Sequence, residues 1–293
     1  MQTALFVVLA LLALFHVLNL VRSQPAAGVS SRPTLAHSCI GFVTNFFDTL
    51  GIGNFAPTAA AYRFLRIVPD ALIPGTMNVG HTLPVIAMAF VFIGIVQVDV
   101  ATLVVMIAAA VLGSWFGAGV VTRLPRRTIQ VGMGFAMLAA AGLFVMAHYE
   151  AFPVGGDALQ LHGVALVVAA VCVAGFGALQ TIGIGLYAPC MILVALLGMN
   201  PKAAFPIMMG ACAFLMPVAS ARFVRHQKYD RRAALGLTLG GLPAVFLAAY
   251  VVQSLPLTTV RWLVIVVSIY AGMSMLLARG GEGPASKALD AEA

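Results

Sequence analysis

The chain has 293 residues, of which 62% are hydrophobic and only 9% are charged, and its mean hydropathy is +1.04. Soluble domains are roughly one-quarter charged, so this composition excludes an ordinary soluble fold and indicates that the lipid bilayer is the solvent. The net charge of +7 does not indicate a nucleic-acid partner, because the basic residues stand between apolar runs and form no single face.

The first apolar run covers residues 1–21 and ends at Arg22, and a polar stretch continues to Pro33. A signal peptide would carry Lys or Arg ahead of its apolar region, and this run has none there. We therefore predict an uncleaved transmembrane helix and linker over 1–33, with the N-terminus outside. Cleavage near Ala26 or Ala27 is the alternative.

The next apolar segment, from about Thr34 to Arg66, is interrupted by Gly51–Asn54. Three uninterrupted segments follow: about 70–95, 99–122 and 128–148. We predict a first repeat over 34–148, followed by an extracytoplasmic linker over 149–160.

The pattern then restarts. A segment from about 161 to 199 is interrupted by Gly183–Gly185. Three further segments follow: about 202–223, 232–252 and 258–278. We predict a second repeat over 161–279 and a disordered cytoplasmic tail over 280–293.

The two halves are related in sequence. Residues 48–57 align with residues 180–189, and between Thr49 and Pro84 this alignment has 12 identities in 36 positions without a gap. The identities include both glycines of a Gly-x-Gly motif and three prolines. Chance matches between apolar segments are mostly Leu and Ala, so the pattern indicates a true internal repeat.

The basic loops predict that the two halves are inverted. In the first half the basic loop joins the third and fourth segments, and in the second half it joins the second and third. Cytoplasmic loops carry an excess of Lys and Arg, so equivalent loops lie on opposite sides. Inversion requires an odd number of crossings per half, and we therefore predict that each interrupted segment enters and leaves on one side.

This topology places 14 Lys and Arg residues inside and two, Lys202 and Arg261, outside. If both interrupted segments crossed fully, a loop with five basic residues would lie outside. The predicted fold is thus an all-α polytopic membrane protein: an inverted repeat of two halves, each with a broken, re-entrant helix plus three transmembrane helices, and an extra N-terminal helix. The cytoplasmic (inner) membrane of a bacterium is the expected location, with the C-terminus inside.

The two interruptions are the predicted binding site. The second half-helices are expected to begin near Phe55 and Tyr187, with Pro57 and Pro189 in their first turns, where a missing N–H is harmless. Helix N-termini present unpaired N–H groups and a partial positive charge, so two that converge near mid-membrane would bind an anion. The alternative is a pair of glycine kinks that serve helix packing only.

The predicted substrate-binding residues are the glycines of the interruptions and the polar residues expected near them: Asn45, Thr49, Gly51, Gly53, Asn54, Asn78, His81, Thr181, Gly183, Gly185 and Tyr187. Thr49 and Thr181 would donate to a substrate oxygen or, alternatively, to a carbonyl of their own helix. Asn78 and His81 share one helical face and would line the cavity or belong to the core.

Asp48 lies inside an apolar segment, and its counterpart in the second half is the neutral Gln180. A buried carboxylate is costly in a membrane, so it must be paired, protonated or in contact with water. We predict a role in proton coupling. A fixed hydrogen-bond anchor for the broken loop is the alternative.

The remaining motifs predict no catalysis. H-E-x-x-H, G-x-S-x-G and Walker A patterns are absent from the sequence, and no C-x-x-C pair suggests a zinc site. We expect no catalytic residue, metal or cofactor, and no enzyme activity. Cys190 and Cys212 are expected to be packing residues, with handling of sulfur compounds as the alternative. The glycines at 113, 117, 236 and 240 are expected to serve close helix contacts.

The two Gly-x-Gly segments resemble those of the sulfite exporter TauE/SafE family, also called the toluene sulfonate uptake permease family. Its repeats open with G-x-G-G-G-x-x-x-P, and the matching positions are Gly51, Gly53, Pro57, Gly183, Gly185 and Pro189. The pair Tyr229–Asp230 is similar to the polar turn of a typical repeat, and the resemblance covers about 35–280. Asn54 and Leu186 stand where a third glycine is usual, the prolines come about two residues early, and Asp48 occupies a usually small position.

The resemblance implies a permease for a small sulfur anion, such as sulfite or a sulfonate, and the residues suggest proton coupling by Asp48. The expected partners are this small anionic solute and the lipid bilayer, with a homo-oligomer left open. The alternatives are an anion or water channel on the same frame, and a membrane assembly factor or intramembrane enzyme.

Overall fold

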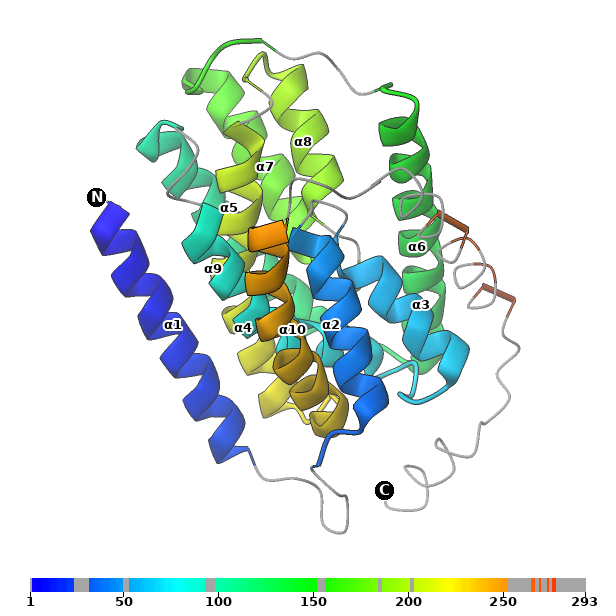
Figure 1. The fold of residues 1–293 in the computed structure, drawn as a ribbon. Coiled ribbons are helices and arrows are strands. Elements are labelled where there is room, and N and C mark those ends of the chain that lie inside the picture. Colours follow the sequence, from blue (N-terminus) through cyan, green and yellow to red (C-terminus); the bar gives the residue numbers. More distant parts are fainter. Residues whose placement is uncertain are drawn as a thin grey trace.

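The computed structural model describes residues 2–23, 32–49, 53–92, 98–151, 156–183, 186–200 and 203–251, with short pieces between 265 and 277. Its helices are α1 (Gln2–Arg22), α2 (Leu35–Thr49), α3 (Phe55–Leu65), α4 (Ile73–Phe92), α5 (Val100–Val121), α6 (Arg126–His148), α7 (Gly163–Gln180), α8 (Tyr187–Leu196), α9 (Ala204–Arg225) and α10 (Arg231–Val251) (Figure 1). The segment expected at 258–278 is described only in fragments, and the tail at 280–293 lies outside the described residues.

The fold is an all-α polytopic membrane protein, as the composition predicts. Five described helices are long and apolar enough to cross a membrane: α1, α5, α7, α9 and α10. The α4 helix is not among them, because it carries polar residues such as Asn78 and His81, both fully buried inside the protein. A helix whose polar side chains face protein does not have to be apolar on every side.

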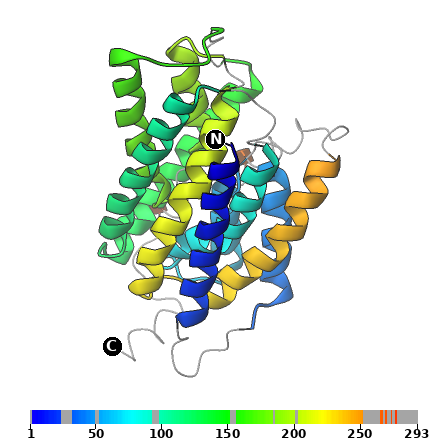
Figure 2. The same ribbon diagram turned by 90° about the vertical axis from the view of Figure 1, so that its left-hand side faces the viewer.

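The described helices form a central layer and a periphery. In the most apolar stretch of α9, 78% of the residues are buried, whereas in that of α1 only 17% are buried. Figure 2 shows α1 on the outside of the bundle, beside α9. The α1 helix is thus mostly exposed to lipid, whereas α4 and α9 contact each other at the centre.

The first interrupted segment enters and leaves on one side of the protein. The α2 and α3 helices are separated by residues 50–54, and the rings of His37 at the start of α2 and Tyr62 near the end of α3 lie 6.3 Å apart. In Figure 1 the α2 helix rises from the lower side and α3 returns toward it.

The second interrupted segment does the same from the opposite side. Before α7, Gly156 donates its N–H to the carbonyl of Met199, which follows α8, at 3.1 Å, and Asn200 donates to the carbonyl of Ala158 at 2.8 Å. The outer ends of α7 and α8 are therefore neighbours, at the upper side in Figure 1. The second segment therefore enters and leaves on one side, although α7, with 18 residues, is by itself long enough to cross a membrane.

The helix contacts repeat in both halves in the way that an inverted repeat requires. The α10 helix of the second half packs on α2 of the first, and α5 of the first half packs on α7 of the second. Likewise α5 contacts α9, and α10 contacts α4. Each broken helix is thus held by the other half. The residue boundaries of the two repeats remain a prediction.

Glycines allow these close contacts between the halves. A Cβ atom on Gly117 of α5 would lie 2.7 Å from the Cα of Ala178 on α7, and one on Gly41 of α2 would lie 2.6 Å from the Cα of Leu237 on α10. The space at Gly113, Gly236 and Gly240 is likewise occupied by the facing helix. The packing role expected for these glycines is confirmed.

A buried ion pair fixes the return of the first broken segment. Arg63 on α3 donates to the Asp70 Oδ2 atom at 2.7 Å, and Gln130 on α6 donates to the same oxygen at 2.7 Å. The Asp70 side chain is only 5% exposed. Asp70 therefore joins α3 and α6 to the turn that precedes α4.

Asp70→Ala is expected to lower the free energy of unfolding by about 3 kcal/mol, because it leaves both donors without this acceptor. Equilibrium unfolding in mixed micelles would measure the loss. Asp157→Ala, which removes an exposed acid, is the matched control and is expected to change little. Equal stability of the two variants would contradict the assigned role of Asp70.

Candidate functional site

A buried polar cluster lies at the break between α2 and α3. The Asn45 side-chain oxygen accepts hydrogen bonds from the Asn54 side-chain amide at 3.2 Å and from His81 Nδ1 at 3.1 Å. The Asn45 amide nitrogen donates to the carbonyl of Gly41 at 2.7 Å, which fixes the orientation of the carboxamide. These bonds join α2, the start of α3 and α4 at one point.

Thr58 completes this cluster from the second turn of α3. Because His81 Nδ1 donates to Asn45, its other ring nitrogen is the acceptor in a neutral imidazole, and Thr58 Oγ1 donates to it at 3.0 Å. Thr58 and His81 are both 0% exposed. The sequence prediction omitted Thr58. Its position four residues after Asn54, on the same face of α3, was the signal that could have identified it.

Asp48 lies beside this cluster and is only 2% exposed. Its carboxyl group interacts with the backbone N–H of Asn54, at the N-terminus of α3. The Oδ2 atom has no hydrogen-bond partner among the described residues. A buried carboxylate oxygen without a donor favours a bound proton or an incoming donor.

Gln180, the counterpart of Asp48, ends α7 on the other side of the site. Its side-chain oxygen accepts a hydrogen bond from the Cys212 thiol on α9 at 3.5 Å. The same thiol lies within electrostatic range of Asp48. Cys212 on α9 therefore bonds to Gln180 and lies within electrostatic range of Asp48, the two equivalent positions of the repeat.

The half-helices have half the length that a membrane span requires. The α3 and α8 helices have 11 and 10 residues. At 1.5 Å per residue each rises about 15 Å, which is half of the roughly 30 Å hydrocarbon layer. Since each ends at its own face of the protein, their N-termini lie at similar depth from opposite sides.

Two of the four predicted hinge glycines adopt backbone conformations that favour glycine. Gly53 has a φ of +87° and Gly183 a φ of +115°. Both values lie in the region that side chains other than glycine rarely adopt. Gly51 and Gly185 lie outside the described residues, and so does the side chain of Tyr187, although Tyr187 is the first residue of α8.

The two threonines bond to their own helices. Thr49 donates to the carbonyl of Asn45 at 2.8 Å, and Thr181 donates to that of Ala178 at 2.6 Å. Of the two roles that the sequence left open, this is the bond to a carbonyl of the residue's own helix. Their hydroxyl hydrogens are therefore in use, and a ligand at the site would meet only their oxygens.

Asn78 is buried on α4 but stands apart from the His81 bonds. It donates to the carbonyl of Pro74 at 2.8 Å, and its side-chain oxygen has no partner among the described residues. The structure thus joins Asn45, Asn54 and His81 directly, and it leaves Asn78 with an unpaired acceptor one helical turn away.

The cluster is strongly asymmetric between the halves. The second-half positions that correspond to Asn45, Asn54, Thr58 and His81 are Gly177, Leu186, Cys190 and Ala213. At these four positions the first half supplies polar side chains, and the second supplies glycine, apolar residues and the buried thiol of Cys190. No group of three or more His, Cys, Asp or Glu residues that could hold a metal occurs in the described part of the chain.

Thr58→Val is expected to lower the free energy of unfolding by about 1–3 kcal/mol, because it leaves the buried acceptor nitrogen of His81 unpaired at nearly constant volume. Thr58→Ser, which keeps the hydroxyl, is the control and is expected to lose less. Equilibrium unfolding in mixed micelles measures both. A Val variant as stable as the Ser variant would show that the Thr58–His81 bond does not hold the site together.

The fold is that of a polytopic membrane protein in which two broken helices enter from opposite sides. Residues 162–291 match the family model described as Sulfite exporter TauE/SafE. The match lies in the second half of the chain, where it confirms the family resemblance. No curated protein and no solved structure matched the chain.

Proposed function

We propose that this protein is a permease that moves a small sulfur oxyanion, such as sulfite or a sulfonate, across the cytoplasmic membrane of a bacterium. The observation that carries the proposal is the pair of half-helices, α3 and α8, that begin near mid-membrane from opposite sides. Their N-terminal N–H groups and partial positive charges suit an oxyanion. The family match over residues 162–291 supports the same class of substrate.

The orientation follows from the basic residues. Arg22, Arg123 and Arg222 lie at one end of the bundle, where α1, α5 and α9 end. Asp99, Glu150 and Asp157 belong to the opposite end, where α5 and α7 begin. By the positive-inside tendency the basic end faces the cytoplasm, so α2 and α3 enter from the inside and the N-terminus lies outside.

Proton coupling is assigned to Asp48. The anion and the carboxylate would repel each other in a site of low dielectric, so a proton on Asp48 would favour binding of the anion. The unpaired Oδ2 atom is where this proton would reside. Rocking of the two halves about the site would then give alternating access.

Uptake by proteoliposomes tests the proposal. We expect saturable uptake of labelled sulfite, sulfoacetate or thiosulfate, faster with an imposed proton gradient than without one. Protein-free liposomes and liposomes with an unrelated membrane protein are the controls. Uptake that rises linearly with concentration would indicate a channel, and no uptake of any sulfur oxyanion above the controls would contradict the assigned substrate class.

A further inference from the structure

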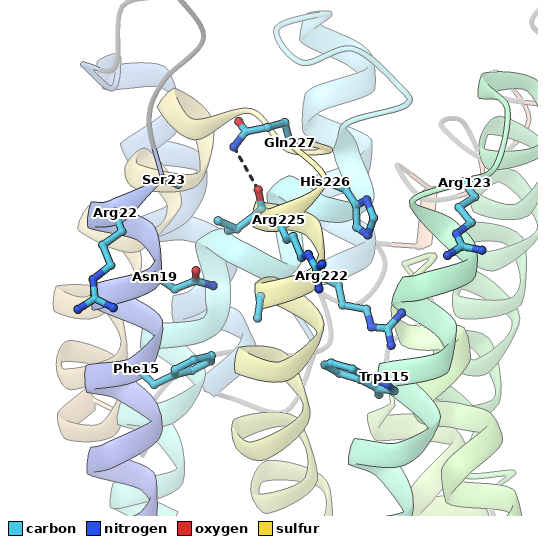
Figure 3. A pocket seen from close by; sticks show the side chains of 12 residues that line it. Phe15, Asn19, Arg22, Ser23, Trp115, Arg123, Arg222, Arg225, His226 and Gln227 are labelled. Atoms are coloured by element: carbon cyan, nitrogen blue, oxygen red, sulfur yellow. Dashed lines mark hydrogen bonds between the residues drawn. The ribbon is translucent and has the colours of Figure 1, made fainter.

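A cavity separate from the two helix breaks lies at the basic end of the bundle. A cavity of about 740 Å³ opens between the ends of α1, α5 and α9. Its lining includes Arg22, Arg123, Arg222 and Arg225, with His226 beside them (Figure 3). None of the described lining residues is acidic. The cavity therefore carries a formal charge of +4 without a countercharge in its wall.

Arg222 is held in place for a ligand. Its guanidinium lies 3.8 Å above the centre of the Trp115 ring on α5, and its Nη1 atom fills the space that a side chain on Gly119 would need. Its Nε atom is buried and has no hydrogen-bond partner among the described residues. Stacking fixes the guanidinium in one orientation, and its Nε–H is free to donate a hydrogen bond. This arrangement suits a planar or tetrahedral oxyanion.

The side chains around the cavity suit a lipid, because apolar residues lie on its membrane side. Phe15 on α1 and Trp115 on α5 line it on the membrane side, and both are exposed. One turn deeper on the same helix faces, Leu11 and Leu112 are exposed as well. An acyl chain could thus follow apolar side chains below a headgroup that the arginines hold.

The end of α1 that borders the cavity is attached to the turn before α10. The Ser23 and Tyr229 hydroxyls are 2.8 Å apart, and Arg231 donates to the Ser23 backbone carbonyl and to its hydroxyl oxygen. The cavity wall contributed by Asn19 and Arg22 is therefore fixed relative to α9 and α10. A basic face kept only for membrane orientation would need neither this attachment nor a stacked Arg222 whose buried Nε atom has no partner among the described residues.

We propose that this cavity binds the phosphodiester headgroup of an anionic phospholipid of the leaflet at the basic end of the bundle. Arg222 and Arg225 would contact the phosphate, and Arg22 and Arg123 would add charge from either side. Basic pockets between transmembrane helices bind such headgroups by this chemistry. The site is separate from the transport site, so its test does not depend on the transported substrate.

Thermal stabilisation of the purified full-length protein in detergent tests the proposal. We expect dioleoyl phosphatidylglycerol to raise the melting temperature in a saturable manner, and dioleoyl phosphatidylcholine to do so much less. Arg222→Gln should weaken the apparent affinity for phosphatidylglycerol by about tenfold, the effect of losing one charge-assisted hydrogen bond. Gly119→Val, which displaces the Arg222 guanidinium without removing its charge, should weaken it in the same direction.

Lys228→Gln is the matched control, because it removes one exposed positive charge from the same end of the protein but does not line the cavity. Equal weakening by Lys228→Gln and Arg222→Gln would show that net charge alone attracts the lipid and would overturn the site. Stabilisation by millimolar inorganic phosphate or glycerol 3-phosphate equal to that by the lipid would overturn the lipid assignment in favour of a soluble phosphate ligand. Native mass spectrometry, counting bound phosphatidylglycerol, provides a readout if a variant's melting curve is altered in the absence of lipid.

Discussion

Replacing Asp48 by Asn is expected to abolish the response of transport to a proton gradient. A carboxyl group exchanges a proton with the medium and a carboxamide does not, so a carrier that uses Asp48 for coupling must lose its pH dependence with this change. Asparagine should fit, because the equivalent position in the second half already carries a carboxamide, Gln180. The variant is also expected to be at least as stable as the parent, since it removes a buried carboxylate whose Oδ2 atom has no partner among the described residues.

Proteoliposome uptake at several internal and external pH values measures the effect. The control is Asp157→Asn, which changes an exposed acid in the same way and should leave the pH profile unaltered. The alternative role for Asp48 is an anchor that accepts the N–H of Asn54. Asparagine retains an acceptor oxygen, so an anchor would survive the change. A normal pH profile in Asp48→Asn would therefore reject proton coupling and leave the anchor.

Leucine in place of Gly53 or Gly183 is expected to reduce transport at least tenfold. A Cβ atom at Gly53 would meet nothing within 4 Å, so the expected loss comes from its φ of +87°, which costs about 1–2 kcal/mol in an L-residue. At Gly183 the φ is +115°, and a Cβ would also lie 3.3 Å from the Met77 Cε atom. Either change should shift the chain that positions a half-helix N-terminus.

Gly175→Ala is the matched control on α7. This glycine has no positive φ, and a Cβ there would meet nothing within 4 Å. Alanine should therefore be neutral or slightly stabilising for the helix and leave uptake unchanged. Size-exclusion profiles and melting temperatures distinguish loss of transport from loss of folding. Normal uptake by folded Gly53→Leu protein would contradict the role of the hinge in the site.

The fold was predictable because its signals are local or periodic. Apolar runs of membrane length, the repeated Gly-x-Gly and the repeated prolines predicted the helices and both breaks. The alternation of basic loops predicted that the two broken segments enter from opposite sides, and which of them enters from the cytoplasm stays a prediction. The length of α7 was less predictable, because no local signal shows how far a helix continues before it breaks.

The side-chain arrangement was only partly predictable. Asn45 and His81 were candidates because polar residues are rare in apolar segments, but their bond across 36 positions depends on how α2 packs on α4. Thr58 shares a face of α3 with Asn54, which could have made it a candidate, but its bond to His81 likewise depends on how α3 packs on α4. The basic cavity joins arginines about 100 residues apart, such as Arg22, Arg123 and Arg222, and no sequence spacing indicates that they meet.

Cysteine accessibility tests the central claim most directly. In a variant without the four native cysteines, single cysteines at Thr34 and Arg66 flank the first broken segment, and those at Asp157 and Asn200 flank the second. With a membrane-impermeant maleimide we expect Thr34→Cys and Arg66→Cys to react from the cytoplasmic side only, and Asp157→Cys and Asn200→Cys from the outside only. Labelling of Thr34→Cys and Arg66→Cys from opposite sides would show that the first segment crosses the membrane, and would contradict a site formed by two re-entrant helices.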